Sequence, residues 1–348
     1  MGEHKAQHKL AQLIKDVKDR KFKYIPKSKK PIDWSAYNTA QYYEMNDFLN
    51  LTRELIDELK LDIGRNVDRG NVGRPPISCF DRAKAILVQQ YFQVSNRETA
   101  GLLLVFKEKL NIKELMNYKT VERSYENPYV MLIFRLLLEK TNQPVTGRET
   151  RFAGDGTGIP TTIKHNYAND RGDEKKMRLY DKMICVIGTE YKLISSVTVT
   201  DGPDNEAPFI VPLLKKTHEM HKQIDIFAYD GAAYSYDIMN YTESIGAKPR
   251  ILPPLDAVLR STGCMAKKRM LSGFLTDTQK WLEEYHIRSL TESRNSVDKR
   301  IDTRPLLKKI ECRRQFEGYA RAIKYNVRLL GYLSHLSDLD IRWLKRGS

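Results

Sequence analysis

Residues 183–199, with the sequence MICVIGTEYKLISSVTV, decide the fold class of this chain. Two runs of β-branched residues, 183–187 and 193–199, flank a short Gly-Thr-Glu-Tyr turn. This pattern predicts a β-hairpin. Residues 151–161, which precede the hairpin, predict another strand and turn. This part of the chain therefore supplies three strands.

After the hairpin the pattern changes to an alternation of helices and strands. We expect a helix at 206–220, a buried strand at 224–229 (IDIFAY) and a helix at 234–244. A short strand at 250–252 and a helix over 285–299 complete the order. Three strands followed by alternating helices and strands predict an α/β fold with a mixed sheet flanked by helices.

Between the basic N-terminal arm and residue 147, the pattern predicts helices on either side of a Gly/Arg-rich linker at 64–76. Residues 35–62 and 78–140 carry apolar residues at helical intervals, and Ser95 and Glu98 fit a capping box. Short helices with cations at a helix start are compatible with helix-turn-helix DNA binding, and also with a plain helical bundle. We divide the chain into a basic N-terminal arm (1–34), a helical region expected to bind DNA (35–146), an α/β core (147–303) and a C-terminal helical tail (304–348).

Charge and composition restrict the class of partner. The 348 residues carry a formal net charge of +15 and are 41% hydrophobic, so we expect a folded protein that attracts polyanions. No apolar run approaches the roughly 20 residues that span a bilayer, and the Lys-rich N-terminus lacks an apolar signal segment. We therefore expect double-stranded DNA as the partner and no membrane. The cysteines form no CxxC pair, which predicts reduced thiols in a cytoplasmic protein.

Four polar residues recur on one side of the expected helix over 285–299. Tyr285, Arg288, Glu292 and Lys299 fall within an arc of about 60° on a helix of 3.6 residues per turn. A carboxylate can hold a hard cation, while Arg and Lys can hold phosphate oxygens. The mixture suits a metal-dependent reaction on a nucleic acid backbone. Taken alone, the same pattern is also typical of a solvated helix face.

Two aspartates stand beside glycines at expected strand positions. Asp155 lies between Gly154 and Gly156, and Asp230 follows the strand IDIFAY. With Glu292 they give three carboxylates from separate elements, which would repel one another unless cations neutralised them. Two Mg²⁺ or Mn²⁺ ions would do so and would serve phosphodiester chemistry. Each aspartate by itself also fits an ordinary turn or cap.

These residues resemble the signature of the DDE transposases of bacterial and archaeal insertion sequences. The late helix matches the pattern Tyr-x2-Arg-x3-Glu-x6-Lys of the YREK group, and Asp155 and Asp230 match the first and second aspartates of the family. The resemblance covers roughly residues 80–335. It implies a ribonuclease-H-like catalytic core after an all-α region.

Some members of this family carry a large β-rich insertion between the second Asp and the Glu. Here only 61 residues separate Asp230 from Glu292, and a helix, a short strand and a basic loop (267–269) are expected to fill them.

The resemblance also implies a reaction and a role for each matching residue. Asp155, Asp230 and Glu292 would hold two divalent ions, and the protein would cleave at transposon terminal inverted repeats to free a 3′-hydroxyl. That hydroxyl would then join target DNA by transesterification. Arg288 and Lys299 would bind phosphates of the transposon end, and Tyr285 would lie beside that backbone.

The resemblance further implies a homodimer in the DNA complex and a cytoplasmic location at the nucleoid. Two alternatives stay open at this point. One is a transposase-derived DNA-binding protein that no longer cleaves, and the other is a nuclease built on the same core.

Overall fold

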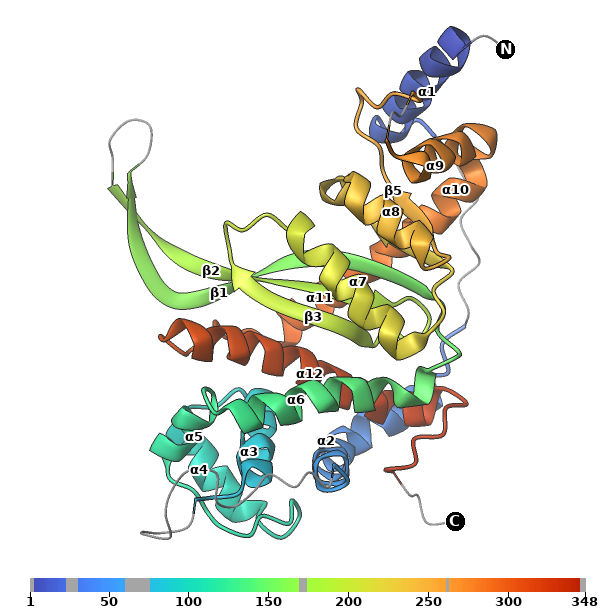
Figure 1. The fold of residues 1–348 in the computed structure, drawn as a ribbon. Coiled ribbons are helices and arrows are strands. Elements are labelled where there is room, and N and C mark those ends of the chain that lie inside the picture. The colour runs from blue at the N-terminus through green and yellow to red at the C-terminus, as the bar shows by residue number, and fades with distance from the viewer. Residues whose placement is uncertain (1–2, 23–30, 60–75, 169–173, 261–262, 345–348) are drawn as a thin grey trace.

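The computed structural model describes residues 3–22, 31–59, 76–168, 174–260 and 263–344. Within these ranges, only the backbone is described for residues 3, 166–168, 174–176 and 298–299. The centre of the molecule is a five-stranded sheet with helices on both faces (Figure 1).

The sheet combines antiparallel and parallel strands. It contains β1 (Arg151–Ala168), β2 (Glu174–Gly188), β3 (Ile194–Asp201), β4 (Ile226–Tyr229) and β5 (Lys248–Ile251), in the order β3-β2-β1-β4-β5. The first three strands are antiparallel, while β4 and β5 run parallel to β1. The end of β2 and β3 form the predicted hairpin. The predicted mixed sheet flanked by helices is thus confirmed, and its order is compatible with a ribonuclease-H-like core.

Helices cover both faces of the sheet because successive side chains of a strand point to opposite sides. On one face, Phe152 and Ile184 belong to the same apolar core as α7 (Ala207–His221) and α8 (Tyr236–Ser244). On the other face, Cys185 and Ile187 share a core with α6 (Pro128–Asn142) and α12 (Glu311–Leu336). With both faces covered, the strand ends are the places where functional side chains can reach a substrate.

Other helices precede the sheet. The region expected to be helical contains α2 (Trp34–Asp57), α3 (Cys79–Phe92), α4 (Asn96–Val105) and α5 (Tyr118–Ser124), whereas α1 (Glu3–Lys18) lies in the expected N-terminal arm. Leu10 and Ile14 of α1 are fully buried in the same core as α9 (Met265–Thr276). The part of the N-terminal arm at 3–18 is therefore a packed helix, while residues 23–30 of the arm lie outside the described residues. The boundaries of the four segments, and DNA binding by residues 35–146, stay predictions.

The structure bears on two expectations from composition, which concern membrane-spanning helices and the cysteines. Among the described helices, none is both long and apolar enough to cross a membrane. The four cysteines are free, with Cys185 and Cys264 buried, Cys79 half-buried and Cys312 exposed.

The helix expected over 285–299 is interrupted, so the prediction of one continuous helix was wrong. Tyr285 ends α10 (Thr278–Tyr285), a 3₁₀ turn follows (His286–Arg288), and α11 (Ser289–Ile301) carries Glu292 and Lys299. The turn lets α10 pack on α9 and β5 while α11 packs on β1. The hydroxyls of Ser289 and Thr291 donate to carbonyl oxygens of the turn (2.8 and 2.6 Å), so the local sequence stabilises this break.

The basic loop expected at residues 267–269 is instead part of α9. Lys267 is buried, and its ammonium lies over the rings of Tyr234 and Tyr236 (5.9 and 5.3 Å). Cation–π contacts of this kind let a lysine pack inside a helical layer. Among the described residues between Asp230 and Glu292, β5 is the only strand, in keeping with the short spacing.

β1 and β2 continue past the sheet as a two-stranded ribbon, which projects away from the helices (Figure 1). β3 pairs with β2 only as far as Asp181, whereas β1 and β2 pair on from Lys164↔Arg178 to Ala168↔Glu174. We call residues 162–168 and 174–180 the β-ribbon. The first strand and its turn were expected to end at residue 161, so β1 is longer than predicted.

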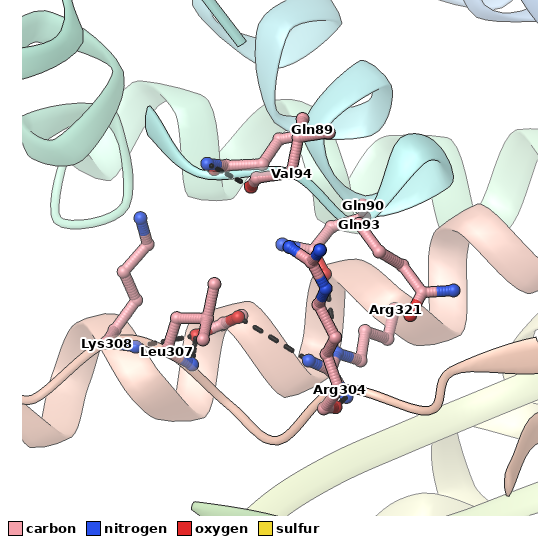
Figure 2. Close-up of a pocket in the computed structure, with 9 residues that line it drawn as sticks. Gln89, Gln90, Gln93, Val94, Arg304, Leu307, Lys308 and Arg321 are labelled. Carbon is pink, nitrogen blue, oxygen red and sulfur yellow. Dashed lines mark hydrogen bonds and ion pairs between the residues drawn. The ribbon is translucent and has the colours of Figure 1, made fainter. Parts of the chain in front are cut away.

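Buried polar groups join the helical region to the C-terminal part of the chain (Figure 2). Arg321 of α12 donates to the carbonyl oxygen of Arg304 (2.9 Å), and Lys308 Nζ donates to Glu122 (3.0 Å). Glu317 accepts from the backbone N–H of Lys308 (2.9 Å). The cavity beside these groups is about 10 Å³, which is room for one water molecule at most. This cluster therefore connects two parts of the fold and is too small to be a ligand site.

Arg314→Met should lower the free energy of unfolding by about 3 kcal/mol, because it would leave the buried carboxylate of Asp181 without its partner. Arg314 Nε of α12 donates to Asp181 Oδ2 of β2 (2.7 Å), and both side chains are almost fully buried. Urea denaturation measures the change. Arg148→Met is the control, since Arg148 pairs with Asp338 on the exposed surface (3.1 Å) and its loss should change the free energy of unfolding very little. Equal effects of the two substitutions would contradict this account.

Candidate active site

The site begins where the parallel strands β1 and β4 stop pairing. Their register runs from Arg151↔Ile226 to Ala153↔Ala228 and ends there. Asp155 and Asp230 each lie two residues beyond the last pair, at the carboxyl ends of the paired segments. Parallel strands deliver these ends to the same edge of a sheet, where substrates of open α/β folds bind. Asp230 also caps a short 3₁₀ turn, accepting from the N–H of Ala232 (2.9 Å).

α11 brings the third carboxylate to the same edge. Asn295 of this helix donates to Asp155 Oδ2 (2.8 Å), which fixes α11 against β1. One turn earlier, Glu292 forms an ion pair with Arg288 (2.7 Å). Asp155 and Asp230 are half-buried, whereas Glu292 is exposed. The arrangement therefore combines two recessed carboxylates with one that faces solvent.

Burial raises the pKa of Asp155 from its ordinary value to about 6. The Arg288 guanidinium opposes this increase, while the carboxylates of Asp230, Glu206 and Glu292 add to it. The predicted trio is thus close enough to interact electrostatically, together with a fourth acid. A nearby cation therefore stabilises a half-buried carboxylate surrounded by like charges more than it stabilises an isolated carboxylate.

The remaining predicted residues have different surroundings. Tyr285 is only 7% exposed, and its ring stacks on Trp281 with centroids 5.5 Å apart. The guanidinium of Arg288 lies 5.9 Å from the centre of the Tyr285 ring. Lys299 belongs to α11, but its side chain lies outside what the structure describes.

Several site residues were not predicted from the sequence. Thr291, Arg294 and Asn295 form the buried side of α11. Arg294 contacts the sulfur of Cys185 on β2 (3.1 Å) and lies over the Tyr325 ring of α12 (5.0 Å). No hydropathy signal marks such a face, because its members are polar. Glu206, at the start of α7, was missed because nothing in its local sequence sets it apart.

The carboxylates are held by protein partners in this structure. Among the described side chains, no group of three or more His, Cys, Asp and Glu is arranged so that it could hold a metal ion as it stands. The Arg288 guanidinium pairs with Glu292 and also interacts electrostatically with Asp155. The donor set itself, three carboxylates and no sulfur or imidazole, is the chemistry that Mg²⁺ and Mn²⁺ prefer.

Similarity to known proteins is slight along the whole chain. No family model matches it, and no curated protein does. Among solved structures, a pre-cleavage Mos1 transpososome is similar to it with a TM-score of 0.22 and 11% sequence identity, over 96% of this chain and 99% of the other. A TM-score this low establishes neither a shared fold nor a shared function.

Asp155→Asn should stabilise the metal-free protein more at pH 7 than at pH 4. The pKa of Asp155 is higher in the folded protein than in the unfolded chain, so the folded state holds the proton more tightly between about pH 4 and 6. The free energy of unfolding of the wild type therefore falls as pH rises through that window, because the tighter proton binding by Asp155 no longer stabilises the folded state. The variant has no Asp155 carboxyl and lacks this decrease. Chemical denaturation in EDTA across this range measures the difference, and parallel curves for the two proteins would contradict the prediction.

Proposed function

We propose that this protein is a DDE transposase with a ribonuclease-H-like catalytic core that acts on double-stranded DNA. One observation carries the proposal: Asp155, Asp230 and Glu292 come from three separate elements, and Asp230 and Glu292 lie close enough to Asp155 to raise its pKa, beside Arg288. Acidic residues from separate elements that lie together at a strand end are typical of a functional site. Their mutual repulsion destabilises the fold, and packing alone gives no reason to place them together.

The carboxylate set supports metal-dependent phosphodiester chemistry. Asp155, Asp230 and Glu292 would hold two Mg²⁺ or Mn²⁺ ions, which when bound supply activation of the attacking oxygen and stabilisation of the leaving oxygen. Hydrolysis would break the bond between phosphorus and the 3′-oxygen at the transposon end. The freed 3′-hydroxyl would attack a phosphorus of target DNA, forming a new ester and releasing a 3′-hydroxyl of the target. Asp155, with a pKa of about 6, would lose its proton before it binds a cation.

Arg288 would exchange Glu292 for a phosphate oxygen of the transposon end, since guanidinium groups bind phosphate with geometry similar to carboxylate. Tyr285 would orient Arg288 through its ring and would touch DNA little, because the phenol is almost fully buried. Lys299, which lies on α11 with Glu292, would bind a neighbouring phosphate. In this way the 3₁₀ turn and α11 together would serve both the cations and the DNA backbone.

The β-ribbon is a second place where the structure supports DNA contact. Lys164 and Arg178 are exposed and directly opposite each other on an isolated pair of strands. Like charges in cross-strand pairs are destabilising, and a phosphate between them would remove the repulsion. A two-stranded ribbon also fits the DNA major groove.

Joining two transposon ends would require a homodimer in the DNA complex.

Asp155→Asn, Asp230→Asn and Glu292→Gln should each lower cleavage by about a thousand-fold or more, because removal of a metal-binding carboxylate costs several kcal/mol of transition-state stabilisation. DNA binding should survive. The assay uses labelled DNA that flanks the gene, with Mn²⁺ present, and follows 3′ nicking and strand joining. Glu219→Gln, at an exposed position of α7, is the matched control.

The outcomes of this assay separate the alternatives. Cleavage retained in one variant would remove that residue from the assignment. A wild type that binds without cutting would favour the DNA-binding protein, and one that cuts without joining would favour the nuclease.

The double substitution Lys164→Gln with Arg178→Gln should reduce the salt dependence of DNA binding. If each cation neutralises one phosphate, the slope of log K against log salt should become less steep by about 1.8. Fluorescence anisotropy with EDTA present measures binding without cleavage. Lys215→Gln with Lys216→Gln removes the same charge from exposed positions of α7 and should leave the slope nearly unchanged. Identical slopes for both variants would exclude the β-ribbon from the DNA interface.

A further inference from the structure

A tyrosine fills the gap where β1 and β4 separate. Tyr229 is the last residue of β4, next to Asp230, and is 1% exposed. Its ring lies against Gly154, because a Cβ at Gly154 would come closer than 3.0 Å to the ring carbons. The glycine before Asp155 therefore provides space for this ring.

The phenol of Tyr229 ends on a carboxylate that belongs to another element. Its hydroxyl donates to Glu206 Oε2 (2.6 Å), directly before α7. The Glu206 carboxylate lies against Gly156, where an added Cβ would again come closer than 3.0 Å. Lys182 Nζ of β2 lies 3.7 Å from Glu206 Oε1. The glycine after Asp155 thus provides space for Glu206.

The two glycines and the aspartate between them face opposite sides of β1. Alternation along the strand places Gly154 and Gly156 towards α7 and Asp155 towards α11, where Asn295 holds it. Tyr229 and Glu206 therefore contact the backbone on both sides of Asp155 without sharing its face. Tyr229 directly precedes Asp230 in the chain. The hydrogen-bonded pair of Tyr229 and Glu206 is therefore next to the backbone of both Asp155 and Asp230.

We propose that Tyr229 and Glu206 form a positioning pair that sets the separation of Asp155 and Asp230 for cation binding. The inference rests on the proposed metal site. The parallel register of β1 and β4 ends at Ala153↔Ala228, before either aspartate is reached. The Tyr229–Glu206 hydrogen bond extends the connection between the strands beyond that pair, since it joins β4 to the segment that packs on Gly156 of β1.

The geometry gives Glu206 a positioning role through Tyr229, and this role does not depend on the charge that Glu206 adds to the surroundings of Asp155. Its carboxylate is on the opposite face of β1 from Asp155, so Glu206 acts as a hydrogen-bond acceptor for the phenol. Glu206→Gln keeps an acceptor oxygen at this position and should retain function. Glu206→Ala and Tyr229→Phe both remove the hydrogen bond, and Gly156→Ala displaces the Glu206 side chain.

The test measures Mn²⁺ binding to the full-length protein by electron paramagnetic resonance, without DNA. Tyr229→Phe, Glu206→Ala and Gly156→Ala should each weaken Mn²⁺ binding about 10- to 100-fold, as substitutions of residues that orient metal ligands commonly do. Glu206→Gln should stay close to the wild type. Tyr125→Phe is the matched control, because it removes a buried phenol that bonds Gln89 and Gln90 (2.7 Å each) far from the site and should affect stability only.

Each result bears on one proposal. If the wild type binds no Mn²⁺ at Asp155, Asp230 and Glu292, the proposed function fails. If the wild type binds and Tyr229→Phe binds equally well, the positioning pair is wrong while the metal site stands. If Glu206→Gln loses as much affinity as Glu206→Ala, the charge of Glu206 is what counts, and positioning through Tyr229 is overturned.

Discussion

Repulsion among carboxylates at the open end of β1 and β4 is the constraint on which the rest of this site depends. The parallel pair ends at Ala153↔Ala228, and the chain places Asp155 and Asp230 just beyond it. Burial and the neighbouring acids raise the pKa of Asp155 to about 6. Such a concentration of negative charge is unfavourable in a half-buried place unless something compensates it. The surrounding elements provide that compensation.

Two kinds of compensation are present. Arg288 supplies a positive charge through its ion pair with Glu292 and its interaction with Asp155. Asn295 supplies a neutral donor to Asp155, which satisfies one oxygen without removing the charge. On the other side of β1, the Tyr229–Glu206 hydrogen bond packs against glycines and leaves the face of Asp155 free. The α7 side of β1 thus carries the Tyr229–Glu206 hydrogen bond, while the α11 side carries the Arg288 and Asn295 groups that compensate the acids.

The sequence predicted the order of the strands and the position of Asp230 directly after β4, because these depend on local patterns. Runs of β-branched residues mark a strand whatever its neighbours, and an Asp beside Gly at a strand end is visible in the residue order. The 285–299 segment was harder, since tertiary packing of α10 and α11 on different elements overrode a continuous helical pattern. The polar buried face of α11 and the β-ribbon carry no hydropathy signal. Glu206 reaches Tyr229 only because α7 begins beside the open end of the sheet, and this is a property of topology rather than of spacing.

The position of Arg288 has a thermodynamic consequence under the proposed function. The same guanidinium cannot pair fully with Glu292 and with a DNA phosphate, so DNA that takes Arg288 away leaves Glu292 available to a cation. A cation bound at Glu292 likewise releases Arg288 for DNA. Linkage requires the two effects to be equal in free energy, so DNA and cation would each increase affinity for the other. Premature cleavage chemistry is thereby disfavoured, since the carboxylates would be fully available to cations only when a phosphate backbone is present.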